Sequence, residues 1–184
     1  MITLITGGSG SGKSAYAEEE FSKLQHTGKK YYVATMKVYD EDGKRRVERH
    51  RKMRENRGFV TIEQPQDIEE AIGKMQGSQN AALLECMSNL VANEMYQDKI
   101  YPADEVVEKI IKGIEDLEKH LVHLMIVTNN VFEDGVLYDE MTMEYLHALD
   151  EVNIRLAKKA EKVIEVVVGI PVCWKGQEGK NEDH

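Results

Sequence analysis

Apolar residues follow two spacings along the chain. Short runs rich in apolar and β-branched residues predict buried β-strands at residues 2–6, 31–35, 59–63, 81–86, 121–128 and 163–168. Apolar residues three or four positions apart predict helices at residues 15–24, 67–75, 104–120 and 141–160, while residues 87–95 fit either a loop or a helix. Strands that alternate with helices indicate an α/β fold with a mostly parallel central sheet and helices on both of its faces.

The pattern indicates a single domain. We expect it to cover residues 1–174 and to be followed by a polar C-terminal tail at residues 175–184. Gly169 and Pro171 follow the strand at residues 163–168, so we expect this strand to be the last.

Composition narrows the class of partner. The formal net charge of −9 argues against a general nucleic-acid-binding protein, which usually carries a basic face. No apolar run approaches the roughly 20 residues of a membrane span. Cys86 and Cys173 lack the spacing of metal ligands, and residue 1 leads into a strand rather than a signal peptide. We therefore expect a reducing, cytoplasmic setting.

Residues 2–14 carry the most specific pattern. The first strand leads into Gly7, Gly8, Ser9, Gly10, Ser11, Gly12, Lys13 and Ser14, which match the P-loop pattern G-x-x-x-x-G-K-[S/T] ahead of a helix. Glycines let the backbone approach a phosphate closely, and N–H groups at the helix start point at the anion. Lys13 is expected to reach the β- and γ-phosphates, and the Ser14 hydroxyl to bind Mg²⁺. A chance glycine-rich turn is the alternative, but every fixed position of the pattern is present.

Two further residues are candidates for the same site. Glu85 ends an apolar strand, where P-loop proteins usually keep an acid that binds Mg²⁺; an ordinary acid at a strand end is the alternative. His50 lies among Arg46, Arg49, Arg51, Lys52 and Arg54. Neighbouring cations favour the neutral, nucleophilic imidazole and offer charge to a triphosphate. Composition alone favours a solvated basic helix with a bystander histidine.

Beyond these residues, the sequence is similar over nearly its full length to the family of bifunctional adenosylcobinamide kinases and adenosylcobinamide-phosphate guanylyltransferases of cobalamin biosynthesis. The segment around His50, together with those around Glu63 and Glu85, makes the resemblance more specific than the P-loop does. The matching segments are residues 2–19, Tyr32-Val33-Ala34-Thr35, residues 46–51, Thr61-Ile62-Glu63-Gln64-Pro65, Leu83-Leu84-Glu85-Cys86, Asn89-Leu90, Asn93, Val127-Thr128-Asn129, Asn153, Leu156-Ala157, Ala160-Glu161 and Val167-Val168-Gly169-Ile170-Pro171.

The resemblance implies a RecA-like P-loop fold and two reactions. A nucleoside triphosphate, ATP or GTP, phosphorylates the aminopropanol hydroxyl of adenosylcobinamide; GTP then gives GMP to that phosphate through a guanylylated histidine, which matches His50. The resemblance also implies a trimer with sites between subunits. The residues that match the family's nucleotide site are Gly7 to Ser14, Ala34, Thr35, Met36, Arg51, Lys52, Met53, Arg54, Glu63 and Glu85.

Some positions depart from the family pattern. Asn130-Val131-Phe132 replaces an acid followed by Val-Gly, Leu146-His147 replaces Arg-Asp, and Asp150 replaces a glycine. The resemblance places these residues in the half of the chain that faces the corrinoid or a neighbouring subunit. Two alternatives therefore stay open: a kinase-only relative that acts on another corrinoid or alcohol, and a non-catalytic nucleotide-binding switch.

Overall fold

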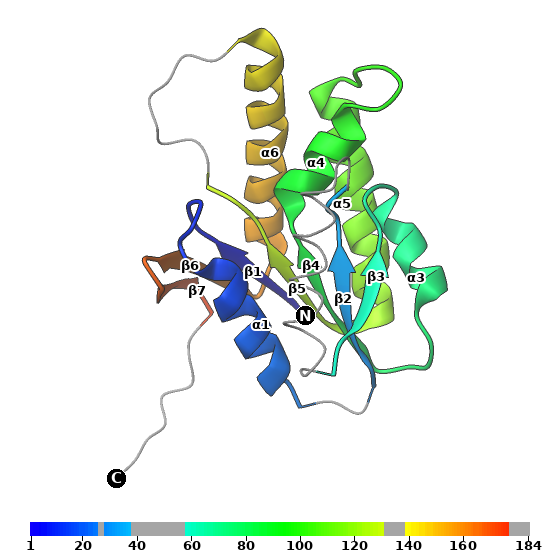
Figure 1. Ribbon diagram of the computed structural model, residues 1–184, viewed down its shortest axis with the longest axis vertical. Coiled ribbons are helices and arrows are strands. Elements are labelled where there is room, and N and C mark those ends of the chain that lie inside the picture. The colour runs from blue at the N-terminus through cyan, green and yellow to red at the C-terminus, as the bar shows by residue number, and fades with distance from the viewer. Residues whose placement is uncertain (26–27, 38–57, 131–138, 177–184) are drawn as a thin grey trace.

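The computed structural model describes residues 1–25, 28–37, 58–130 and 139–176, and Figure 1 shows their arrangement. Within this part, seven strands form one sheet in the order β3-β2-β4-β5-β1-β6-β7. The strands are β1 (Ile2–Thr6), β2 (Lys30–Ala34), β3 (Val60–Glu63), β4 (Asn80–Glu85), β5 (Leu121–Val127), β6 (Lys162–Val167) and β7 (Ile170–Lys175). The helices are α1 (Lys13–Lys23), the 3₁₀ turn η2 (Ile68–Glu70), α3 (Ala71–Lys74), α4 (Met87–Met95), α5 (Ala103–His120) and α6 (Glu140–Lys159).

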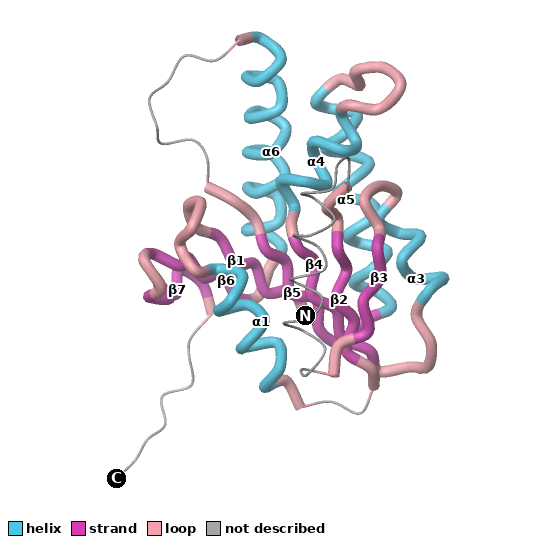
Figure 2. The backbone as a smooth tube through the Cα atoms, in the orientation of Figure 1, coloured by secondary structure: helices cyan, strands magenta, loops and turns pink. Residues whose placement is uncertain are grey.

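The parallel strands end level with one another. Strands β1 to β6 run parallel to their neighbours, whereas β7 pairs antiparallel with β6. Ala34 lies opposite both Glu63 and Glu85, and Val127 lies opposite both Glu85 and Ile5. The loops that follow these strands therefore gather at the carboxyl edge of the sheet, which is uppermost in Figure 2.

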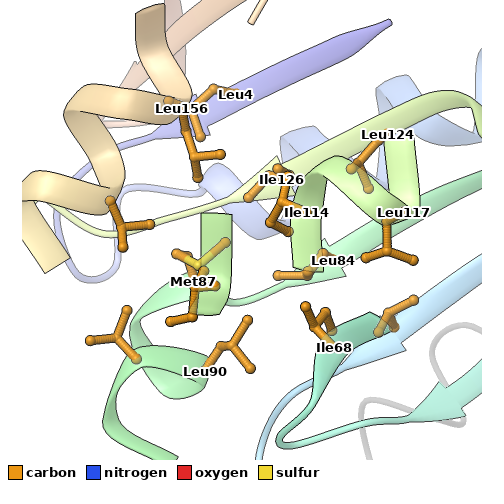
Figure 3. Close-up of a cluster of buried hydrophobic side chains, with 14 of the residues drawn as sticks. Leu4, Ile68, Leu84, Met87, Leu90, Ile114, Leu117, Leu124, Ile126 and Leu156 are labelled. Atoms are coloured by element: carbon orange, nitrogen blue, oxygen red, sulfur yellow. The ribbon is translucent and has the colours of Figure 1, made fainter. Parts of the chain in front are cut away.

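Adjacent strand residues pack against opposite faces of the sheet. On one face, Leu84 and Ile126 meet Ile114 and Leu117 of α5 and Leu156 of α6 (Figure 3). Each of these side chains is fully buried, and burial of one leucine or isoleucine stabilises the fold by about 1.5–3 kcal/mol. The apolar stripe of α5, predicted from its helical spacing, thus covers this face.

Helix α1 covers part of the other face. Its buried residues Ala17 and Phe21 pack in a second cluster with Leu83, Met125 and Val127 of the sheet. Helices therefore lie on both faces, and the predicted α/β architecture with a mostly parallel sheet and a P-loop between the first strand and helix is confirmed.

One predicted strand assignment was wrong. The strand expected at residues 163–168 is not the last, because β7 follows it after a turn at Val168 and Gly169. Both turn residues have positive φ, of 50° and 83°, which matches the twist of a tight hairpin. Pro171 does not prevent the pairing because β7 is an edge strand. The strand includes Lys175, the first residue of the predicted tail.

The helix predicted at residues 67–75 forms in two parts. Asp67 has a left-handed backbone, with φ 48°, so regular helix cannot begin there; the 3₁₀ turn η2 follows and continues into α3. Residues 87–95, for which the sequence left two alternatives, form the helix α4.

None of the helices among the described residues is both long and apolar enough to cross a membrane.

Candidate active site

The loop after β1 has the backbone shape of a phosphate cradle. Gly12 precedes α1 with φ 89°, and the Ser11 N–H donates to the Gly8 carbonyl at 3.2 Å. Gly7 has φ 153°, and a Cβ at this position would lie 2.5 Å from the Val166 carbonyl oxygen and 2.7 Å from Ser11 Oγ. Only glycine fits there, because the loop passes this close to β6.

Backbone hydrogen bonds fix the loop to the strands on both sides. The Asn130 N–H, just beyond β5, donates to the Gly7 carbonyl at 3.2 Å. The Gly169 N–H, in the β6–β7 turn, donates to the Ser11 carbonyl at 2.8 Å. The second contact was not predicted, since nothing in the sequence pattern indicates that the chain continues into a hairpin beside the P-loop.

Lys13 is buried within this loop at the first residue of α1. Its side chain is 8% exposed, and Nζ donates to the Gly8 carbonyl at 3.0 Å. Burial lowers the pKa of the Lys13 ammonium below 10.5, while the nearby charges of Cys86 and Glu85 act in the opposite direction. The amine therefore lies against the backbone of the phosphate loop. Ser14 follows it, half-buried in the first turn of α1.

Glu85 is held in place at the end of β4. Tyr32 is buried, and its hydroxyl donates to Glu85 Oε2 at 2.6 Å. The charge of this carboxylate raises the Lys13 pKa, in opposition to the effect of burial. Among the described residues, no group of three or more His, Cys, Asp or Glu side chains could hold a metal by itself.

The oxygen donors of Ser14 and Glu85 fit a Mg²⁺ ion that is shared with a bound nucleotide. Mg²⁺ in nucleotide sites is usually bound by one or two protein oxygens together with phosphate oxygens and water. Ser14 offers a hydroxyl and Glu85 a carboxylate, both hard oxygen ligands that suit this ion.

The predicted nucleotide residues at the ends of β2 and β3 lie in one row with Glu85. Ala34 pairs with both Glu63 and Glu85 across the sheet. The Thr35 N–H donates to the Glu85 carbonyl at 3.0 Å, and Asn93 Nδ2 donates to the Thr35 carbonyl at 2.7 Å. These bonds fix the direction in which the chain leaves β2. The next residue, Met36, is half-buried, and Glu63 is exposed.

Several predicted site residues lie outside the described part of the chain. They include the candidate nucleophile His50 and its neighbours Arg51, Lys52, Met53 and Arg54. Phe132, one of the departures from the family pattern, also lies outside it.

A chain of polar side chains connects α4, β5 and α6 behind the site. Thr128 Oγ1 donates to Asn153 Oδ1 at 2.6 Å, and Asn153 Nδ2 donates to the Asn129 carbonyl at 3.2 Å. Asn129 Nδ2 in turn donates to Ser88 Oγ at 2.8 Å. The resemblance had identified both asparagines without a role. Their bonds hold the end of β5, from which Asn130 reaches the P-loop.

The residues of α6 that depart from the family pattern lie near these hydrogen-bonded polar side chains rather than at the phosphate loop. Tyr145 donates from its hydroxyl to the Ser88 carbonyl at 3.2 Å, and burial raises its pKa to about 12. Leu146 and Asp150 are half-buried, and His147 is exposed.

A pocket that the sequence pattern does not indicate lies on the opposite side of the P-loop from Glu85. It has a volume of about 350 Å³ and is lined by residues 8–11 of the loop, Asn130, Glu165 and residues 166–168. A larger pocket of about 480 Å³, lined by Lys29, Gln76 and Asn80 among others, lies at the amino ends of β2 and β4. We assign no chemistry to the larger one, because ligands of parallel α/β sheets bind at the carboxyl ends of the strands.

Known proteins resemble this chain over its length. Residues 3–174 match the family described as cobinamide kinase / cobinamide phosphate guanyltransferase. A bifunctional adenosylcobalamin biosynthesis protein CobU of Escherichia coli (strain K12) is 28% identical over 185 residues, covering 94% of this chain and 98% of that protein. The bifunctional adenosylcobalamin biosynthesis protein CobP of Pseudomonas aeruginosa is 24% identical over 177 residues, covering 96% and 99%.

Two solved structures are also similar, each with a TM-score of 0.49. One is an ATPase domain that is 10% identical, covering 89% of this chain and 68% of that chain. The other is the flagellar accessory protein FlaH of Methanocaldococcus jannaschii, which is 13% identical, covering 97% and 82%. The family match runs from β1 into β7, so this chain belongs to the cobinamide kinase / cobinamide phosphate guanyltransferase family, and the predicted transferase class is confirmed.

Proposed function

We propose that this chain phosphorylates the aminopropanol hydroxyl of adenosylcobinamide and then transfers GMP from GTP to that phosphate, giving adenosylcobinamide-GDP. The observation that carries the proposal is the P-loop itself, with Lys13 buried in the loop and bonded to its backbone at Gly8. Family membership supplies the class of acceptor, since the relatives are named for adenosylcobalamin biosynthesis.

In the first step, the hydroxyl oxygen of the acceptor attacks the γ-phosphorus of the nucleoside triphosphate. The bond from the γ-phosphorus to the β–γ bridging oxygen breaks, the nucleoside diphosphate leaves, and the hydroxyl proton passes to water. The N–H groups of the loop and the Lys13 ammonium stabilise the negative charge on the phosphate oxygens. Ser14 and Glu85 would hold Mg²⁺, which supplies further positive charge to the phosphates.

In the second step, an imidazole nitrogen of His50 attacks the α-phosphorus of GTP and pyrophosphate leaves. A phosphate oxygen of the phosphorylated acceptor then attacks the same phosphorus, and the phosphorus–nitrogen bond breaks. The basic residues Arg51, Lys52 and Arg54 provide charge for the pyrophosphate. Covalent catalysis of this kind divides one difficult transfer into two easier ones.

The mass of the intact protein after incubation with GTP and Mg²⁺ tests the second step. We expect a gain of one GMP in the wild type, measured at neutral to alkaline pH because a phosphorus–nitrogen bond is labile in acid. His50→Ala should show no gain. A wild-type protein that binds GTP without any gain would contradict the covalent histidine intermediate.

The departures at Asn130, Phe132 and Leu146 support a non-catalytic nucleotide-binding switch. A kinase-only protein is the second candidate, and it keeps phosphoryl transfer through Lys13 and Ser14. It predicts that cobinamide phosphorylation proceeds at the same rate in the wild type and in His50→Ala, with no guanylylated protein. Both candidates predict that Lys13→Ala loses phosphorylation by at least about a hundredfold, because the ammonium acts on the transferring group. GTP or ATP binding without any phosphorylation of cobinamide would instead support a nucleotide-binding switch.

The proposed assembly is a homotrimer with sites between subunits. It rests on the resemblance to the family, and sedimentation analysis of the purified protein tests it. A monomer that retains both activities would contradict it.

A further inference from the structure

We propose that the pocket between the P-loop and β6 holds the base and ribose of the triphosphate used in the phosphoryl-transfer step, and that Glu165 there recognises guanine. This inference rests on the proposed function, since it concerns the nucleotide of the kinase step. It assigns a role to a region of β6 and β7 that the predicted site did not include.

The pocket shares a wall with the phosphate cradle. Residues 8–11 of the P-loop form one side, Asn130 a second, and residues 165–168 of β6 and its turn a third. Its volume of about 350 Å³ lies within the range of small-ligand sites, which begins near 300 Å³. A nucleotide whose phosphates contact the loop can therefore place its nucleoside here without crossing open surface.

The direction of the phosphates supports this side. Lys13 is expected to reach the β- and γ-phosphates, and Glu85 ends β4 as the proposed Mg²⁺ ligand, so these two residues mark the end of the site where the γ-phosphate reacts. Strand β1, which leads into the loop, has β5 and then β4 on one side and β6 on the other. A triphosphate with its γ-phosphate toward β4 consequently has its α-phosphate and nucleoside toward β6.

A carboxylate in this pocket wall selects hydrogen-bond donors. Glu165 would repel a phosphate, so the wall suits a neutral group that donates protons. Guanine presents two adjacent donors, N1–H and the 2-amino group, which match the two oxygens of one carboxylate. Adenine presents an unprotonated N1 and a single amino group at this edge, so the same carboxylate disfavours it.

Neighbouring groups hold the carboxylate and complete the pocket. Trp174 of β7 donates from Nε1 to Glu165 Oε2 at 3.0 Å, and the tryptophan side chain remains 69% exposed. Its ring therefore offers an aromatic surface one hydrogen bond away from the pocket wall. Ser11, in the P-loop wall, has a buried Oγ that lacks a hydrogen-bond partner within the described part of the chain. A bound nucleotide could supply that partner.

The chain contains a single tryptophan, so its fluorescence reports on the environment of Trp174, which donates a hydrogen bond to Glu165 in the pocket wall. We would titrate the full-length protein, with Mg²⁺, with GDP, with IDP and with inorganic tripolyphosphate. IDP lacks only the 2-amino group, and tripolyphosphate has no nucleoside. We expect GDP to change the Trp174 emission until the site is saturated. Tripolyphosphate should also bind, as measured by calorimetry, but should change the Trp174 emission much less.

Glu165→Gln tests the recognition of guanine. The wild type should bind GDP at least about tenfold more tightly than IDP, because a hydrogen bond to a charged acceptor is lost with IDP. In Glu165→Gln this preference should disappear, and the KM for GTP in cobinamide phosphorylation should rise about tenfold or more. Tripolyphosphate affinity should not change, because tripolyphosphate has no base for Glu165 to contact. Glu105→Gln, an exposed substitution on α5, is the matched control and should behave as the wild type.

Two results would overturn the inference while leaving the proposed function intact. The first is a wild-type protein that binds tripolyphosphate and phosphorylates cobinamide, but that binds GDP and IDP equally tightly, as Glu165→Gln also does. The other is Trp174 emission that depends on protein concentration but not on bound GDP, which would make the hairpin a contact between copies of the chain. Absence of tripolyphosphate binding in the wild type would instead contradict the proposed function itself.

Discussion

At the residue scale, the carboxylate assigned to Mg²⁺ depends on one buried neighbour. Glu85 is the only protein carboxylate that we assign to this ion, and Tyr32 donates to its Oε2 at 2.6 Å from the adjacent strand. The bond fixes the direction of the carboxylate before nucleotide binds, so the orientation does not have to be gained during the reaction. Tyr32 is thus a positioning residue that the sequence did not identify.

Tyr32→Phe should raise the Mg²⁺ concentration needed for half-maximal phosphorylation and lower kcat by about tenfold, because a hydrogen bond to a charged group is removed. The measurement is the Mg²⁺ dependence of cobinamide phosphorylation. Tyr31→Phe is the matched control: the Tyr31 hydroxyl bonds to the backbone of Gln76 instead, at 3.2 Å and 2.8 Å. Its Mg²⁺ dependence should be that of the wild type. Equal Mg²⁺ dependence in both variants would refute the positioning role of Tyr32.

Lys13 gives the site a dependence on pH. Burial lowers the pKa of the free ammonium below 10.5, and bound phosphate raises it again because an anion favours the charged form. The phosphate-bound protein therefore holds more protons than the free protein between these two pKa values, so affinity must fall as pH rises through this window.

Calorimetric titration with tripolyphosphate should show that the affinity falls by up to about tenfold per pH unit, beginning below pH 10.5. Lys13→Met should bind weakly and without a decline in the same window. A Lys13→Met protein whose affinity falls as steeply as that of the wild type would assign the titration to another group.

At the element scale, α5 approaches the η2 turn so closely that one helix position must be glycine. A Cβ on Gly113 would lie 2.6 Å from Ile68 Cγ2 and 3.0 Å from Glu69 Oε2. Ile68 is buried in the same core as the apolar face of α5. Gly73, in α3, is also helical but has open space around the position of its Cβ. The two helical glycines should therefore respond in opposite directions to the same substitution.

Gly113→Ala should destabilise the protein by about 1–3 kcal/mol, because the core must shift to accept the methyl group. Gly73→Ala should stabilise it by up to about 1 kcal/mol, since alanine has the better helix propensity and meets no neighbour. Urea denaturation followed by circular dichroism measures both. The close packing of α5 on η2 would be disproved by a Gly113→Ala protein at least as stable as the wild type.

At the scale of the whole molecule, function is expected at one edge of the sheet. The P-loop, Glu85 and the pocket at Glu165 lie at the carboxyl ends of the parallel strands, whereas the larger pocket at Lys29 lies at their amino ends. Stabilisation by a bound ligand should therefore depend on residues at the carboxyl ends of the strands and should not depend on residues at their amino ends.

Saturation with Mg²⁺ and GTP at about a hundred times the Kd should stabilise the folded protein by about 2.7 kcal/mol, or roughly 5–10 °C in Tm for a chain of this size. Differential scanning calorimetry of the wild type, Lys13→Ala and Lys29→Ala tests this. Lys13→Ala should lose most of the shift and Lys29→Ala should keep it. If the Tm shift were lost in Lys29→Ala but kept in Lys13→Ala, the nucleotide would bind at the amino ends of the strands, which would contradict the proposal.

The amino-acid sequence by itself determined the elements and the phosphate loop. Both are local properties: buried parallel strands need continuous apolar runs, amphipathic helices need apolar residues three or four positions apart, and the loop needs glycines where its backbone turns. For this reason six of the seven strands and the position of Lys13 at the start of α1 could be predicted within a residue or two. The main helices were predictable on the same grounds.

Tertiary structure alone decided which distant residues share the site. Strand order placed β5 between β1 and β4, and register set Glu63, Ala34 and Glu85 in one row; neither follows from local spacing. The bond from Tyr32 to Glu85 and the contact of Gly169 with the P-loop join residues far apart in the chain. The β7 hairpin escaped prediction because Pro171 argues against a strand everywhere except at a sheet edge, and only the assembled sheet shows which strand is at the edge.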